Sequence, residues 1–137
     1  MKGVYTLIDN PEQERTLFFE VDAVADSTID FLKDFIMDID GFVTMAGFAD
    51  NKPLHGTLEI ALHTRRELVY KFEFTGNDGK IYRFEGHKTD ISITTVAKTM
   101  TTLYSKVYNN GDEIADAVLH FDLKDIGEFL LSWKPTL

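Results

Sequence analysis

Four polar residues in the C-terminal part of the chain have the side-chain types of a nucleophile, a general base and an orienting group: Thr101, Ser105, His120 and Asp122. Strand pairing would place them on one face of a hairpin, and a small hydrolase or isomerase using His120 and Asp122 is one interpretation. A strand face turned to solvent has the same composition. We therefore assign no catalytic residue and keep this chemistry as an alternative.

Metal chemistry is a second possibility, because the chain has four histidines, at His55, His63, His87 and His120. None belongs to an HxH or HExxH motif. His63 and His87 are expected on strands that flank a third strand, with backbones about 9–10 Å apart, so a shared zinc ion is geometrically marginal. The chain also has no cysteine and no glycine-rich phosphate-binding loop. We predict no metal site and no cofactor.

Size and charge restrict the class of partner. The chain has 137 residues, 44% of them hydrophobic and 12% aromatic, and a formal net charge of −9. This length suits one domain, residues 1–137, with a core of its own. The negative charge opposes binding to nucleic acid or anionic membrane surfaces. No apolar run reaches the length of a membrane span or of a signal peptide, so we expect a cytoplasmic protein.

The elements that must position these residues are mostly strands. Runs of β-branched and aromatic residues between turn-forming residues predict about eight strands, at 2–9, 15–24, 41–49, 54–63, 67–75, 80–89, 98–108 and 113–123. Two segments with helical spacing of apolar residues predict helices near 27–38 and near 125–133. Short links imply antiparallel neighbours, and closure would remove the exposed sheet edges. We predict a mainly β fold, an antiparallel meander that closes into a small barrel.

The stretch KFEFTGNDGKIYRFEG has a nearly symmetrical pattern that fixes its register. A three-residue loop with Gly79 in the left-handed conformation pairs Phe72 with Phe84 on one face. The same register pairs Lys71 with Glu85 on the other face, where each opposite-charge pair contributes ~0.2–1 kcal/mol. A two-residue loop would instead set aromatic residues against charges. The stretch therefore predicts a hairpin with one aromatic face and one charged face.

The next predicted hairpin turns at Asn110-Gly111, a preferred type I′ pair. A regular register from this turn pairs Met100 with Phe121 and Tyr104 with Ala117. We expect that face to be the interior, because it carries the large apolar groups. The opposite, polar face would carry His120.

Four segments together resemble a known module: GFADNKPLHGTLEI (47–60), YKFEFTGNDGKIYRFEGHK (70–88), TMTTLYSKVYNNG (99–111) and LHFDLKDIGEFLLSW (119–133). They are similar to a β-rich accessory module of cholesterol-oxidase-like glucose-methanol-choline oxidoreductases and of some lipase-like bacterial proteins. The likeness covers about residues 42–133 and rests on turn glycines and core aromatics. It implies a non-catalytic module that accompanies enzymes acting on sterols or lipids, and it transfers no catalytic residue.

Taken together, these patterns predict a lipocalin-like (calycin) barrel that binds an apolar small molecule or lipid, or serves a partner enzyme. Its interior would be lined by Tyr70, Phe72, Phe74, Tyr82, Phe84, Met100, Tyr104 and Phe121. The same aromatic residues would also suit a filled core. The alternative is then a module for protein interaction or homodimer formation.

Overall fold

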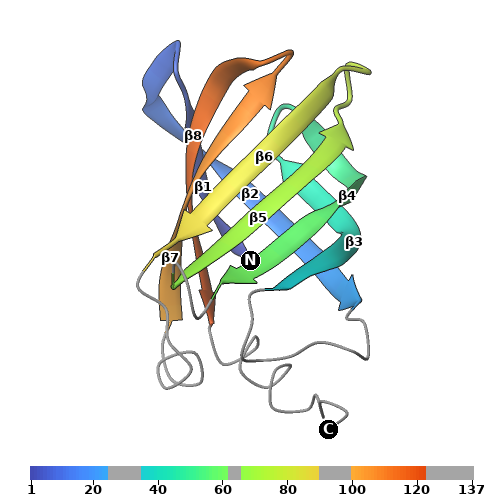
Figure 1. Cartoon of the computed structure of the whole chain (residues 1–137). Helices are drawn as coiled ribbons and strands as arrows, with labels where there is room; N and C mark the ends of the chain where they lie inside the picture. Colours follow the sequence, from blue (N-terminus) through green and yellow to red (C-terminus); the bar gives the residue numbers. More distant parts are fainter. Residues whose placement is uncertain (25–34, 62–65, 90–99, 123–137) are drawn as a thin grey trace, which may run out of the picture.

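The computed structural model describes residues 1–24, 35–61, 66–89 and 100–122. Within these ranges the regular secondary structure consists of eight strands (Figure 1). They are β1 (Lys2–Leu7), β2 (Asn10–Val24), β3 (Phe35–Met45), β4 (Ala49–Ala61), β5 (Glu67–Thr75), β6 (Ile81–Lys88), β7 (Met100–Asn109) and β8 (Asp112–Asp122). No helix in the described ranges is long and apolar enough to cross a membrane.

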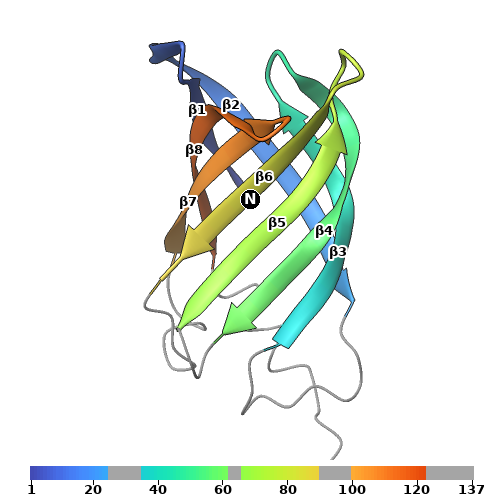
Figure 2. The ribbon, with the colours of Figure 1, turned by 45° about the horizontal axis from the view of Figure 1, so that its top comes forward.

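The sheet is closed. Each strand pairs antiparallel with the next one along the chain, and β8 pairs with β1, so the eight strands form a barrel (Figure 2). The predicted meander and its closure are therefore confirmed. The turns that join β1 to β2, β3 to β4, β5 to β6 and β7 to β8 lie together at one end of the barrel (Figure 1).

The helix predicted near residues 27–38 is wrong for residues 35–38, which belong to β3. Ile36 is 62% exposed whereas Met37 and Ile39 are buried, which is the alternation of a strand. Ile36 and Ile39 also fit a helical period, but in the barrel they face opposite sides of the sheet. Residues 27–34 and the helix predicted near 125–133 lie outside the described residues.

The β5–β6 hairpin has the predicted register. Phe72 pairs with Phe84, and their rings stack with centroids 4.5 Å apart. On the outer face Lys71 pairs with Glu85. Gly79 has a φ of 80°, the left-handed conformation that the three-residue loop requires. The alternation of aromatic and charged residues was sufficient to fix this hairpin.

The β7–β8 hairpin leaves the predicted register after a correctly predicted turn. Asn110 and Gly111 both have positive φ, 50° and 84°, as in a type I′ turn. A β-bulge follows, because an extra residue of β8, Ile114, shifts the pairing by one residue. Tyr104 therefore pairs with Val118, and its side chain is 65% exposed on the outer face. The predicted inward placement of Tyr104 is wrong.

The bulge changes the inward face of β7 and leaves that of β8 as predicted. Since strand side chains alternate, a shift of one residue moves every side chain of β7 to the other face. Leu103, Ser105 and Val107 are the buried residues of β7. The backbone pairs Met100 with Asp122 and Phe121 with Thr101, so the predicted pairing of Met100 with Phe121 is also wrong. The side chains of Met100 and Phe121 lie outside the described residues.

The interior of the barrel contains a continuous apolar core to which all eight strands contribute. Phe19 of β2 reaches across it, with its ring centroid 5.1 Å from that of Phe72 in β5 and 5.4 Å from that of Phe84 in β6. β2 and β6 lie on opposite sides of the closed circuit of strands. Rings from opposite walls are thus in contact, and the described barrel is filled at the level of Phe19.

Aromatic side chains also cover the end of the barrel where the four tight turns lie. Phe48, in the turn between β3 and β4, packs edge-on against Tyr5 and Tyr82, with centroids 6.2 Å and 5.5 Å away. The Phe48 carbonyl accepts a hydrogen bond of 2.7 Å from the Asn77 N–H, which joins this turn to the β5–β6 turn. The Tyr5 hydroxyl donates to the Ala46 carbonyl. These contacts continue the core up to the turns.

Candidate functional site

The five aromatic residues of the β5–β6 hairpin that were expected to face the interior do so, and all are buried: Tyr70, Phe72, Phe74, Tyr82 and Phe84. Their rings contact one another and Phe19 at distances typical of packed aromatic pairs. These are the contacts of a core. Their role in ligand binding stays a prediction.

Polar groups are scarce in the described interior. Ser105 is buried, and its hydroxyl donates to the Leu103 carbonyl at 3.4 Å. The Tyr82 hydroxyl donates to Asp78 Oδ2 at 2.7 Å, at the capped end of the barrel. Burial raises the pKa of Tyr70 above its ordinary value, and burial together with the Asp78 contact raises the pKa of Tyr82 to about 12. Both tyrosines are therefore neutral at physiological pH.

The residues considered for catalysis are only partly brought together. His120 lies on the outer face of β8, with its Nδ1 3.3 Å from Thr102 Oγ1. Ser105 is buried inside the barrel, because the bulge turns it inward. Ser105 and His120 thus lie on opposite faces of the sheet and do not form a nucleophile–base pair. The side chains of Thr101 and Asp122 lie outside the described residues.

The other described histidines contact carboxylates. His55 Nδ1 lies 2.7 Å from Asp40 Oδ1, and this contact raises the pKa of His55. His87 Nδ1 lies 2.8 Å from Glu67 Oε1. Among the described residues, no three histidine or acidic side chains are grouped so that they could hold a metal ion. His63 lies outside the described residues.

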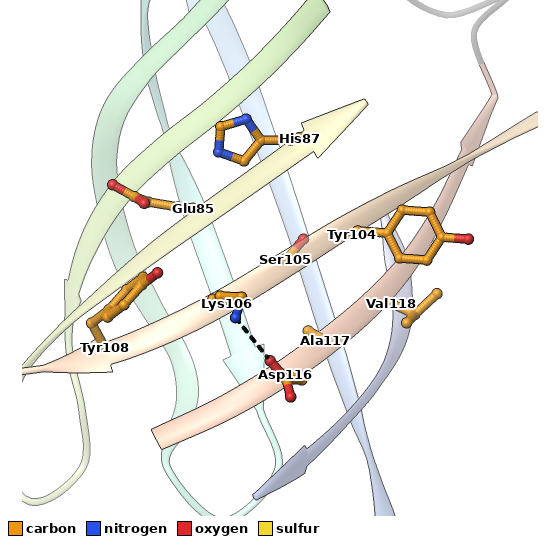
Figure 3. A pocket seen from close by; sticks show the side chains of 9 residues that line it. All are labelled: Glu85, His87, Tyr104, Ser105, Lys106, Tyr108, Asp116, Ala117 and Val118. Atoms are coloured by element: carbon orange, nitrogen blue, oxygen red, sulfur yellow. Dashed lines mark ion pairs between the residues drawn. The ribbon is translucent and has the colours of Figure 1, made fainter. Parts of the chain in front are cut away.

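A pocket of about 550 Å³ lies on the outer face of the barrel, over β6, β7 and β8 (Figure 3). Its outward side chains are Glu85 and His87 from β6, Tyr104, Lys106 and Tyr108 from β7, and Asp116 and Val118 from β8. We call it the outer pocket. The strand register arranges its side chains in two rows: His87, Tyr104 and Val118 are neighbours in one, and Glu85, Lys106 and Asp116 in the next.

In the charged row, one lysine contacts more than one carboxylate. Lys106 Nζ lies 3.0 Å from Glu113 Oε1 and 4.0 Å from Asp116 Oδ1, so two carboxylates share one ammonium group. The proximity of the Glu113 carboxyl group raises the pKa of Asp116. The contact with Lys106 lowers the pKa of Glu113. Glu113 and Asp116 thus carry more negative charge than Lys106 neutralises.

The tyrosines of the outer pocket supply its aromatic surface. Tyr104 is the most exposed large hydrophobic side chain among the described residues, at 65%. Tyr108 has the guanidinium carbon of Arg83 at 5.2 Å from its ring centroid, a cation–π contact. The outer pocket can therefore offer both a ring face and a carboxylate to a bound group.

Sequence reasoning missed the outer pocket because it placed Tyr104 inside the barrel. One signal could have corrected this placement. Lys106 is two residues from Tyr104 and therefore shares its face of β7. An inward Tyr104 would have required an inward lysine, whereas Leu103, Ser105 and Val107 form an inward face without charge.

No protein-family model, curated protein or solved structure matches this chain. Within the described residues, the barrel interior and the outer pocket are the two regions with the side chains of a binding site. The interior contains aromatic rings that touch from opposite walls, as Phe19 and Phe84 do. The outer pocket contains exposed aromatic and charged groups on three adjacent strands. The second arrangement can bind a partner without displacing the core.

Proposed function

We propose that this protein is a non-catalytic binding module that contacts its partner through the outer pocket, with the barrel as a rigid support. The observation that carries the proposal is the position of open volume relative to the core. Phe19 spans the barrel to Phe72 and Phe84, whereas the outer pocket of about 550 Å³ lies outside the sheet. Volumes of 300–1,000 Å³ are typical of sites for small groups.

The outer pocket has the side-chain composition of an interaction site. Exposed tyrosine is enriched in protein interfaces because it combines a large apolar ring with a polar group. Tyr104 is 65% exposed and lies beside the half-buried Val118. An aromatic or aliphatic group of a partner that covers Tyr104 would remove apolar area from water, at roughly 25 cal/mol per Å².

A role beside a partner enzyme fits this arrangement. The accessory module of oxidoreductases that residues 42–133 are expected to resemble would have such a role. An apolar small molecule or lipid inside the barrel at the level of Phe19 would have to displace Phe19 or the rings that it contacts. That displacement would open the core, which costs several kcal/mol. We therefore place binding on the outer face.

The proposal is tested by mapping where a small aromatic probe binds. We expect p-cresol, a fragment of a tyrosine side chain, to shift the amide NMR signals of Tyr104 and Val118 in a saturable manner. Tyr104→Ala should weaken this effect. Ile81→Ala is the matched control, because Ile81 is 62% exposed on the outer face but does not line the outer pocket. Shifts confined to interior residues, or the absence of any saturable shift, would overturn the proposal.

A further inference from the structure

Asp116, which lines the outer pocket, and the neighbouring Glu113 together carry one more negative charge than Lys106 neutralises. Glu113 and Asp116 both approach Lys106 Nζ, at 3.0 Å and 4.0 Å, and Lys106 is the one cation that the described residues bring within 4.0 Å of them. The carboxylate of Asp116 is 59% exposed and lines the outer pocket. A second cation placed beside Asp116 would relieve the repulsion between the two carboxyl groups.

The aromatic side of the outer pocket is suited to a planar cation. Tyr104 is diagonal to Asp116 across β7 and β8, on the same face of the sheet. The neighbouring Tyr108 already has the Arg83 guanidinium over its ring, at 5.2 Å from the centroid. The same face thus holds one guanidinium–tyrosine contact and has an exposed tyrosine at a position diagonal to an exposed carboxylate.

Resting on the proposed function, we infer that the outer pocket binds an arginine side chain of a partner protein, with Asp116 as the carboxylate contact and Tyr104 as the ring contact. A guanidinium group can stack on a ring while it donates two parallel hydrogen bonds to a carboxylate. The net charge of −9 attracts a basic segment and opposes phosphate or lipid headgroups. The partner is therefore a protein with an exposed basic segment.

The test compares two peptides that differ in one charge. The first is Gly-Arg-Gly with an acetylated N-terminus and an amidated C-terminus, and the second has citrulline in place of arginine. Citrulline keeps the planar shape and loses the positive charge. We expect the arginine peptide to shift the amide signals of Tyr104 and Asp116, and the citrulline peptide to bind about tenfold more weakly. Added salt should weaken the arginine peptide alone.

Two variants identify the contacts. Asp116→Asn should reduce binding of the arginine peptide to the level of the citrulline peptide, and Tyr104→Ala should weaken both. Asp112→Asn is the matched control, because Asp112 is an exposed aspartate of β8 that does not line the outer pocket. It should leave binding of the arginine peptide unchanged. The comparison of the two peptides on the unmodified protein does not depend on the folding of any variant.

Each other outcome overturns the inference in a distinct way. Equal binding of the two peptides in the outer pocket would overturn it and leave the proposed function standing. If neither peptide shifts the amide signals of the outer pocket but p-cresol does, the arginine inference is also overturned and the proposed function stands. If p-cresol and both peptides leave the outer pocket unchanged, both proposals fail. Shifts of Tyr104 that grow with protein concentration alone would place a second copy there and overturn the arginine assignment.

Discussion

At the scale of single residues, Tyr82 connects the core to the β5–β6 turn. Its ring stacks on Phe74 and contacts Phe48 edge-on, with centroids 5.6 Å and 5.5 Å away. Its hydroxyl donates to Asp78 Oδ2 at 2.7 Å, while Asp78 Oδ1 accepts the Lys80 N–H at 3.0 Å. These hydrogen bonds lower the pKa of Asp78 below its ordinary value of 3.8.

Removing the Tyr82 hydroxyl should change how the stability of the protein depends on pH. The lowered pKa of Asp78 means that its stabilising contribution is present above its ordinary pKa of 3.8 and is lost as the pH falls through the lowered value. In Tyr82→Phe the Asp78 pKa should rise toward the ordinary value, and this acid-dependent loss should shrink. Carboxyl ¹³C NMR titration measures the pKa, and urea unfolding at several pH values measures the loss.

Tyr104→Phe is the control for that experiment, because it removes a hydroxyl from an exposed tyrosine that does not contact Asp78. It should leave the Asp78 pKa unchanged. An unchanged Asp78 pKa in Tyr82→Phe would show that the Tyr82 hydroxyl does not stabilise the ionised Asp78 carboxylate in solution.

At the scale of elements, glycine is required at two positions for different physical reasons. Gly56 in β4 pairs with Phe72 in β5, and a Cβ added there would lie 1.9 Å from the Lys71 carbonyl oxygen. Glycine is needed at position 56 because the two strands approach closely there. Gly79 has a φ of 80°, and a Cβ added there would meet nothing within 4 Å. Glycine is needed at position 79 because of its left-handed backbone conformation.

The two alanine variants should therefore differ in stability. Gly79→Ala places a side chain in the left-handed region, which costs about 1–3 kcal/mol. Gly56→Ala forces the β4 and β5 backbones apart, so we expect the larger loss and a distorted register near Phe72. Urea unfolding of both variants measures the difference. Equal losses, or a larger loss for Gly79→Ala, would contradict the close approach at Gly56.

The strands differ in how far their sequence determined them. β5 and β6 were predictable because the loop at Gly79 and the alternating charges admit one good register. β3 was not, because Ile36 and Ile39 fit a helical period as well as a strand, and only the pairing with β4 decides between them. The register of β7 depends on one extra residue, Ile114, and the sequence signal for it is indirect, the charge of Lys106 on the face of Tyr104. The outer pocket depends on that bulge, and so it was missed.

At the scale of the whole molecule, closure determines what the interior can hold. An eight-stranded barrel has an interior just wide enough for side chains to fill or for one small ligand. The sequence predicted which residues of β5 and β6 face inward, but it could not give the distance between opposite walls. The contact of Phe19 with Phe84 shows that side chains from opposite walls meet at this level, which favours a filled core. We therefore propose the outer face as the surface for binding.

A titration with dodecanoic acid, followed in the methyl NMR spectra of inward leucines, tests this claim most directly. Leu17, Leu58 and Leu103 are buried and lie on three different strands, so they report on the interior. We predict that their methyl signals stay unchanged, since the rings of Phe19, Phe72 and Phe84 meet across the interior. A saturable shift of these signals with one fatty acid per chain would contradict the account and place the binding site inside the barrel.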